Sequence, residues 1–292
     1  MAKRRCVALG VLCASFVGCG AHARGDAAPG GKRFDGFPPG DVIAPSAPTA
    51  TRTAPPQIET PEASDARPRP PPFAELDVPG FDRAVVSFPP SAPLPQPLLV
   101  STHGAGDSPA QMCELWRGIL GDRGVVLCPA GPRMRAHEEG RYYPDHHALE
   151  KITLASIRAL AEKYPALVDA RRAIYSGYSQ GATMGALMIP PYGAECPRLV
   201  LAEGGFDDWS LERASTFRKS GGERVLFICG RQRCKDAARR SAAYLENVGV
   251  TAHVVSHVGE GHVVRIAELA TPELDWLLED DPRWGTPSAD HD

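Results

Sequence analysis

After its first 18 residues the sequence has no uninterrupted apolar run approaching the ~18 residues that a membrane-spanning helix needs. It also has little net charge, with 32 Lys and Arg against 35 Asp and Glu, and so lacks the basic surplus that nucleic-acid binding favours. No two cysteines have C-x-x-C spacing, and the cysteines therefore do not indicate a metal site. These absences argue against a membrane helix in the body of the chain, and against nucleic acid or a metal as a partner.

The hydrophobic content is sufficient for a sizeable core, because 43% of the 292 residues are apolar. A chain of this length forms one large domain or two small ones. The 29 prolines are distributed unevenly and crowd the segment 19–72, where they alternate with Ala, Thr, Ser and Gly. Few large apolar residues occur there, so burial cannot offset the entropy of the chain. We expect 19–72 to be a disordered, semi-rigid tether.

The first 18 residues have the pattern of a secretory signal peptide. The basic segment 3–5 precedes an apolar stretch, 6–18, which is too short to cross a bilayer. The stretch ends in the sequence F-V-G-C, which resembles the lipobox of bacterial lipoproteins. That resemblance implies cleavage before Cys19, acylation of Cys19, and a periplasmic or outer-membrane-anchored protein. The alternative is a plain signal peptide that is cut nearby, at Ala21 or Ala23.

From residue 73 to residue 281 the apolar pattern alternates between strand and helix. Short apolar runs predict strands at 83–88, 97–102, 124–128, 172–176, 199–202, 224–229 and 251–256. Helical spacing predicts helices at 109–120, 148–164, 180–189, 211–219, 237–247 and 264–278. Strands that alternate with helices of this length indicate a single α/β domain, with a mostly parallel central sheet covered by helices on both faces. Residues 282–292 are expected to form a flexible tail.

The segment 177–181 reads G-Y-S-Q-G and fits the pattern G-x-S-x-G between a predicted strand and a predicted helix. At such a turn the serine has a strained backbone, and its hydroxyl stands above the sheet at the positive end of the following helix. We therefore interpret Ser179 as a nucleophile. The alternative is a structural turn with an idle serine.

Two further segments could complete a site around this serine. The segment 103–106, H-G-A-G, follows an early strand, where the N–H of Ala105 could stabilise an oxyanion together with the N–H of Gln180. The segment 259–262, G-E-G-H, follows the last predicted strand and ends in His262. Because His262 lies downstream of the serine and after a strand, it is a candidate for the base that accepts the proton of Ser179.

These three segments, in this order, resemble the α/β-hydrolase superfamily over about residues 81–278. The chain is most similar in style to secreted esterases of the dienelactone-hydrolase and polyhydroxybutyrate-depolymerase-like groups. The resemblance implies a small-molecule carboxylic ester as substrate, a covalent acyl-serine intermediate, water as the final acceptor, and no metal or organic cofactor. A peptidase or thioesterase of the same fold, or a degenerate domain that only binds, stays open at this point.

The acid that would orient His262 is ambiguous. In the superfamily it commonly follows the strand before the penultimate helix, but here that position reads G-R-Q-R-C-K, and the first carboxylate is Asp236. Glu203, at the end of the preceding predicted strand, is the alternative. We favour Asp236, on the expectation that the segment 231–233 folds outward, although Asp236 would also suit a helix cap.

The remaining cysteines allow disulfide bonds in an exported protein. Of eight cysteines, those at positions 6, 13 and 19 lie in the leader, which leaves Cys113, Cys128, Cys196, Cys229 and Cys234. We expect a Cys113–Cys128 bond, with Cys229–Cys234 as a second pair. The arginines at 231 and 233 are expected in solvated loops; a place at the mouth of the site, favouring an anionic substrate, is the alternative.

Overall fold

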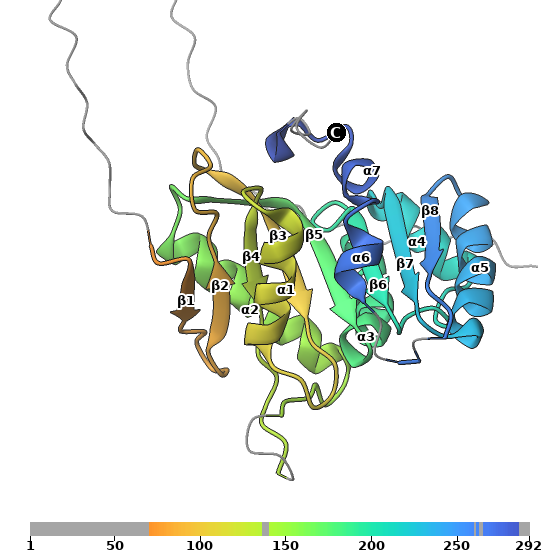
Figure 1. Cartoon of the computed structure of the whole chain (residues 1–292), viewed down its shortest axis with the longest axis horizontal. Helices are drawn as coiled ribbons and strands as arrows, with labels where there is room; N and C mark the ends of the chain where they lie inside the picture. The colour runs from red at the N-terminus through yellow and green to blue at the C-terminus, as the bar shows by residue number, and fades with distance from the viewer. Residues whose placement is uncertain (1–69, 136–139, 260, 263–264, 286–292) are drawn as a thin grey trace, which may run out of the picture. The chain divides into compact units, whose positions relative to one another are not determined.

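The apolar runs of the sequence form a single sheet with helices on both faces (Figure 1). The computed structural model describes residues 70–135, 140–259, 261–262 and 265–285. These residues all belong to one unit, which runs from Ala63 to Asp292. The predicted signal peptide, Cys19 and nearly all of the predicted tether fall outside the described residues, as does most of the predicted tail.

The strands and helices alternate along the chain as the sequence predicts. The strands are β1 (Phe73–Leu76), β2 (Ala84–Ser87), β3 (Gln96–Thr102), β4 (Val125–Cys128), β5 (Val168–Tyr178), β6 (Arg198–Ala202), β7 (Arg224–Cys229) and β8 (Thr251–Ser256). The helices are α1 (Pro109–Leu120), α2 (His146–Lys163), α3 (Gln180–Met188), α4 (Leu211–Ser220), α5 (Gln232–Glu246), α6 (Ile266–Ala270) and α7 (Leu274–Leu278), with short 3-10 turns at Pro190–Tyr192 and Pro282–Trp284.

The sheet has the strand order β1-β2-β4-β3-β5-β6-β7-β8. The two strands at one edge are antiparallel, since β1 pairs with β2 and β2 with β4 in that sense. From β4 to β8 every pairing is parallel. The carboxyl ends of parallel strands all lie on the same side of the domain, and ligands of α/β proteins bind there. The loops after β3, β5, β6, β7 and β8 therefore meet at this carboxyl-terminal side of the sheet.

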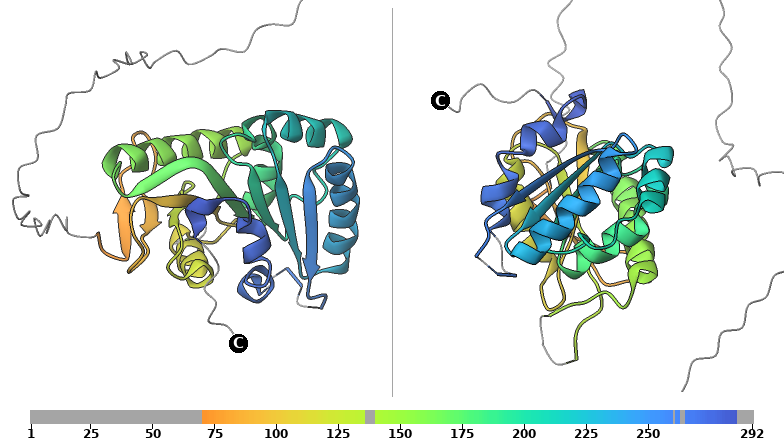
Figure 2. Two further views of the ribbon diagram at one scale, coloured as in Figure 1. Left: turned by 90° about the horizontal axis from the view of Figure 1, so that it is seen from above. Right: turned by 90° about the vertical axis from the view of Figure 1, so that its right-hand side faces the viewer.

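Side chains alternate between the two faces of the sheet, and each face has its own hydrophobic core. In β7, Val225 and Phe227 face one helical layer, whereas Leu226 and Ile228 face the other. Buried residues of α2, α3, α4 and α5 belong to the first core, and those of α1, α6 and α7 to the second. Figure 2 shows the sheet between these two layers. Both faces of the central strands are apolar because both are covered.

Three local expectations are corrected by the structure. β1, which is short and half exposed, has too little alternation to stand out in the sequence. α5 begins at Gln232 rather than at 237. The final helix is two helices, because the chain turns between Ala270 and Leu274, where Pro272 cannot continue a hydrogen-bonded helix.

The expected cysteine pairs lie at disulfide distance. Cys113 of α1 pairs with Cys128 at the end of β4, with their Cα atoms 5.8 Å apart. Cys229 at the end of β7 pairs with Cys234 in the first turn of α5, with a Cα separation of 5.5 Å. Cys196 is buried and free. Among the described residues, no helix has the length and apolar character to cross a membrane.

Candidate active site

Ser179 lies at the sharp turn between β5 and α3, in a backbone conformation that non-glycine residues rarely adopt, with φ of 50° and ψ of −110°. The glycines on either side permit this turn. A Cβ on Gly177 would lie 2.5 Å from the backbone nitrogen of Ala182, and one on Gly181 would lie 2.5 Å from Oγ1 of Thr102. Strand and helix can approach this closely only without side chains at these positions, which leaves the half-buried serine at the tip of the turn.

The structure brings His262 to this serine. Its Nε2 lies 2.7 Å from Oγ of Ser179. The imidazole stacks on the ring of Tyr178 with centroids 5.5 Å apart, and the Tyr178 hydroxyl donates a hydrogen bond of 2.9 Å to the carbonyl oxygen of His262. The ring is thus fixed from the side by Tyr178, the residue that immediately precedes the serine.

Glu203 lies on the other side of His262. It directly follows β6, has a φ of 50°, and is buried. Its Oε1 accepts hydrogen bonds from the backbone N–H groups of Gly230 at 2.6 Å and Arg231 at 3.1 Å. Its Oε2 accepts from Nε of Arg231 at 2.6 Å and lies 3.3 Å from Nδ1 of His262. Because the carboxylate can only accept, Nδ1 carries the proton, and Nε2 is left as an acceptor for the serine hydroxyl.

The carboxylate that the structure brings to His262 is the alternative acid, Glu203, whereas the carboxylate of Asp236 contacts Gln232 on its own helix. The helix α5 begins at Gln232, so Asp236 lies on the exposed side of its second turn, where it accepts a hydrogen bond of 2.8 Å from Nε2 of Gln232. It does not cap the helix either, since the N-cap is Arg231. The segment 231–233 does not fold outward, because it is already the start of α5.

The loop after β3 approaches the serine closely enough to form an oxyanion site. A Cβ on Gly104 would lie 3.2 Å from Cβ of Ser179. The loop is held in shape by a hydrogen bond from the N–H of Gly106 to the carbonyl of Arg141, at 2.8 Å. The side chain of Gln180 accepts the N–H of Tyr143 at 2.8 Å. The backbone N–H groups of Ala105 and Gln180 have no hydrogen-bond partner within the described part of the chain.

His103, at the start of this loop, holds the loop in place. Both of its ring nitrogens form hydrogen bonds to the backbone, so it is not a catalytic base. Its Nδ1 donates to the carbonyl of Gly104 at 2.8 Å, and its Nε2 accepts the N–H of Gly131 at 3.3 Å. Its ring stacks on Tyr143, with centroids 4.4 Å apart. Burial lowers the pKa of His103 to about 4, so the ring is neutral at pH 7.

Solved structures share this architecture, although no family model and no curated protein matches the sequence. A fluorophosphonate-binding serine hydrolase, FphF of Staphylococcus aureus, with substrate bound, is similar with a TM-score of 0.52 and 13% identity over 72% of this chain and 100% of that one. The carboxylesterase of Bacillus cereus has a TM-score of 0.50 and 18% identity over 66% of this chain and 92% of its own. Esterase PE8 has a TM-score of 0.51 and 17% identity over 66% and 97%. The chain has the α/β-hydrolase fold.

Within this fold, a pocket of about 310 Å³ adjoins the Ser179–His262–Glu203 cluster. It is lined by Thr183, Glu203, Gly204, Phe206, Asp207, Arg231, Arg233 and Cys234. A Cβ on Gly204 would lie 2.1 Å from the carbonyl oxygen of Ser179, so one lining residue of this pocket packs against the backbone of the serine turn. The arginines at 231 and 233, expected in solvated loops, line it.

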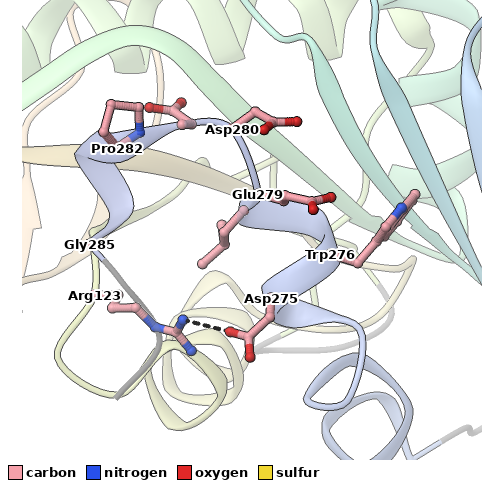
Figure 3. A pocket seen from close by; sticks show the side chains of 9 residues that line it. Arg123, Asp275, Trp276, Glu279, Asp280, Pro282 and Gly285 are labelled. Carbon is pink, nitrogen blue, oxygen red and sulfur yellow. Dashed lines mark hydrogen bonds and ion pairs between the residues drawn. The ribbon is translucent and has the colours of Figure 1, made fainter. Parts of the chain in front are cut away.

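A larger cleft of about 710 Å³ lies elsewhere and contains none of these residues (Figure 3). It is lined by residues of α7 and by Arg123, which forms a 3.2 Å ion pair with Asp275. Arg123 precedes β4, whereas Ser179 follows β5, and these parallel strands place the two positions at opposite edges of the sheet. The cleft therefore plays no part in the arrangement around Ser179.

Two residues near the site were not recognised from the sequence. Arg231 contacts Glu203, as described above, and the carboxylate of Asp107 lies beside Gly104, where its charge acts on Tyr178 and His262. Burial raises the pKa of Asp107, while the Gly104 N–H opposes that rise. Glu203, Cys229 and Cys234 are the one cluster of potential metal ligands in the described ranges, and the bond between the two cysteines removes both thiolates.

Proposed function

We propose that the protein is a serine esterase, which hydrolyses a carboxylic ester through an acyl-serine intermediate. The observation that carries the proposal is the contact of 2.7 Å between Oγ of Ser179 and Nε2 of His262, while Nδ1 of the same ring faces the buried carboxylate of Glu203. A hydroxyl with a base within hydrogen-bond reach, and the base oriented by an acid, is the arrangement that activates a serine. Esterases and a serine hydrolase among the structural neighbours support it.

The reaction follows from these positions. Oγ of Ser179 attacks the carbonyl carbon of the ester, and its proton passes to Nε2 of His262. The negative charge that develops on the carbonyl oxygen is stabilised by the N–H groups of Gln180 and Ala105. The tetrahedral intermediate then expels the alcohol, which takes the proton from Nε2, and leaves the acyl group on Ser179. Water, deprotonated by His262, attacks this acyl group and releases the carboxylic acid and the free serine.

Glu203 performs the role of the acid in this proposal. The charged carboxylate fixes the ring tautomer through Nδ1 and stabilises the imidazolium that forms during each transfer. Its two oxygens face four donors, the backbone N–H groups of Gly230 and Arg231, Nε of Arg231 and Nδ1 of His262, and these contacts hold the carboxylate beside the ring. No metal or organic cofactor is required for these steps.

The chemistry is tested by labelling with a fluorophosphonate and by the variant Ser179→Ala. We expect wild-type protein to be labelled at Ser179 and to hydrolyse p-nitrophenyl esters, with a panel of increasing acyl length defining the preferred chain. Ser179→Ala should lose labelling and lower kcat by about 10⁴–10⁶. An unlabelled wild-type protein would favour the degenerate, binding-only alternative, and activity confined to thioesters or peptides would favour a thioesterase or peptidase.

We also propose that the enzyme is exported and lipid-anchored, with residues 1–18 as signal peptide, Cys19 as the acylated residue, 19–72 as tether and the hydrolase domain from residue 73 onward. The predicted start of the tail at 282 is too early, because Pro282–Trp284 forms a 3-10 turn and Trp284 is buried in the second core. Disulfide bonds are typical of exported proteins, and the two cysteine pairs support this location of the enzyme. Fractionation of cells that produce wild-type and Cys19→Ser protein tests it. The wild type should be found in the membrane fraction, and the variant should not.

A further inference from the structure

One oxygen of the Glu203 carboxylate, Oε2, lies close to two groups. One is a guanidinium, which is always charged, and the other is an imidazole, which can become charged. Oε2 is 2.6 Å from Nε of Arg231 but 3.3 Å from Nδ1 of His262. A guanidinium is always charged, and charge-assisted hydrogen bonds of this length are the stronger kind. Arg231 is therefore the closer and permanent partner of the acid, and His262 the weaker one in the resting protein.

Arg231 lies at the end of β7, a position that often carries a functional residue in the superfamily that the sequence resembles. It directly follows Gly230 at the end of β7, where the superfamily that the sequence resembles commonly carries its acid. In this chain the acid comes from the end of β6 instead, and the arginine at the end of β7 points back to it. The arginine that stands where the superfamily commonly has its acid thus contacts the carboxylate to which we assign that role.

The backbone around Arg231 contributes to the same contact. The N–H groups of Gly230 and Arg231 both donate to Oε1 of Glu203, so the two oxygens are held by separate donors. The Cys229–Cys234 bond closes the short segment that carries these donors. With both oxygens fixed, the carboxylate cannot rotate away from the ring of His262.

We propose that Arg231 is a positioning residue of the active site. It orients Glu203, and it reduces the attraction between the negative charge of Glu203 and a proton on His262. The proposal rests on the function proposed above. With Arg231 present, part of the negative charge of Glu203 is neutralised, and His262 more readily stays unprotonated, the form that accepts the serine proton. Without it, the carboxylate both loosens and attracts a proton on His262 more strongly.

Few other charged groups act on this ring. Among the described residues, those that face His262 are Glu203, the half-buried Asp107 on the loop after β3, and the neutral Tyr178 hydroxyl. Arg231 acts on the ring through Glu203, and its positive charge also reaches Tyr178. A change at Arg231 leaves Glu203, Asp107 and Tyr178 in the protein, and the Glu203→Gln background separates the effect that passes through the carboxylate from the others.

The experiment compares Arg231→Met, Arg231→Lys and the control Arg239→Met, which removes an exposed arginine from the same helix outside the pocket. On a neutral p-nitrophenyl ester, Arg231→Met should lower kcat by about 10–100-fold, the cost of a misplaced catalytic group. The acid limb of its kcat/KM profile should move upward by about 1 pH unit. Arg231→Lys should restore much of the pH profile, and Arg239→Met should match the wild type.

A second measurement does not depend on turnover. The ring protons of His262 are titrated by NMR in wild type, Arg231→Met, Glu203→Gln and the double variant. The titration midpoint should rise in Arg231→Met and should not change when Arg231→Met is added to Glu203→Gln, because the effect passes through the carboxylate. This result would stand even if the wild type failed to react with a fluorophosphonate and the proposed function were wrong.

Two outcomes would overturn the proposal. One is an unchanged acid limb and an unchanged midpoint in Arg231→Met, with only a lower Tm, which would make Arg231 a structural residue. The other is a higher KM confined to negatively charged esters with unchanged kcat and pH profile, which would make Arg231 a substrate-binding residue instead.

Discussion

Glu203 and His262 meet across an intervening strand. They are 59 positions apart, with Glu203 after β6 and His262 in the loop after β8, and β7 lies between those strands. A glutamate is long enough to reach over the end of β7, where an aspartate would be shorter by one methylene. The extra methylene of Glu203 therefore suits the role of acid that we propose for it.

The first prediction compares Glu203→Gln with Asp236→Asn. The amide of Gln cannot stabilise an imidazolium, so Glu203→Gln should lower kcat by about 10⁴. Asp236→Asn should keep kcat within a few-fold of wild type, because the exposed carboxylate of Asp236 accepts its hydrogen bond from Gln232 on the same helix. Turnover of a p-nitrophenyl ester and Tm are measured for both. Loss of activity in Asp236→Asn with full activity in Glu203→Gln would contradict the geometry.

The fold was predictable because it depends on periodicity. The strands β2, β3, β4, β6 and β7 are largely buried, mostly apolar runs, and α1 was predicted at its observed bounds. Ser179, His262, Ala105 and Gln180 come from segments whose glycines and local order reveal a turn or loop at a strand end. These signals are local, and a single sequence carries them in full.

The carboxylate that contacts His262 was not predictable to the same degree, because the position of Asp236 depends on the residue at which α5 begins. If α5 began at 237, Asp236 would lie in a loop near the strand end; since α5 begins at Gln232, it lies on an exposed helical face. Nothing in the spacing of 230–235 distinguishes these cases, because Arg231 is a poor N-cap residue and gives no start signal. The contact between Arg231 and Glu203 joins residues 28 positions apart and likewise has no local pattern.

The two cysteine pairs should differ in what their removal costs. Cys113 and Cys128 are 15 positions apart, and a bond over a loop of this length contributes about 3 kcal/mol in the chain-entropy model. The variant Cys113→Ala/Cys128→Ala should lose about that much free energy of unfolding in urea. Treatment of the wild type with a reductant should reproduce the loss, whereas equal stability of oxidised and reduced protein would mean that the bond contributes nothing.

Removal of the Cys229–Cys234 bond should affect activity more than stability. The loop is only 5 positions long, so the entropic contribution is smaller, about 2 kcal/mol. However, it carries two of the N–H donors to Glu203. We expect Cys229→Ala/Cys234→Ala to lower kcat by about 10-fold or more through the misplaced acid. Urea unfolding and kcat are measured together; unchanged kcat in a folded variant would contradict the expectation.

Gly104 should be intolerant of even one methyl group. Its Cβ would lie 3.2 Å from Cβ of Ser179 and 2.5 Å from Oδ2 of Asp107, so the loop that carries Ala105 would have to shift. We expect Gly104→Ala to lower kcat by about 100-fold or more, the cost of one lost oxyanion donor. Gly118→Ala in α1 is the control, since nothing lies within 4 Å of its Cβ, and it should be active and slightly more stable. Equal kcat for the two variants would argue against this loop as the oxyanion site.

The buried His103 should make the folded state sensitive to acid. Its pKa falls from 6.5 to about 4 on folding because burial disfavours the charged ring, whereas the unfolded chain binds a proton near pH 6.5. Between these values the unfolded state holds more protons, so stability is full above about pH 6.5 and declines as the pH falls toward 4. A shift of this size amounts to about 3 kcal/mol by linkage. Urea unfolding of wild type and His103→Gln at pH 7.5 and pH 4.5 tests it: the advantage of the wild type should shrink by about 2–3 kcal/mol at the lower pH. A difference in stability between wild type and His103→Gln that does not vary with pH would contradict this prediction. If His103→Gln does not fold, the ring of His103 is titrated by NMR in the wild type instead. A titration midpoint near the ordinary value of a histidine would then show that the loop does not hold the ring neutral.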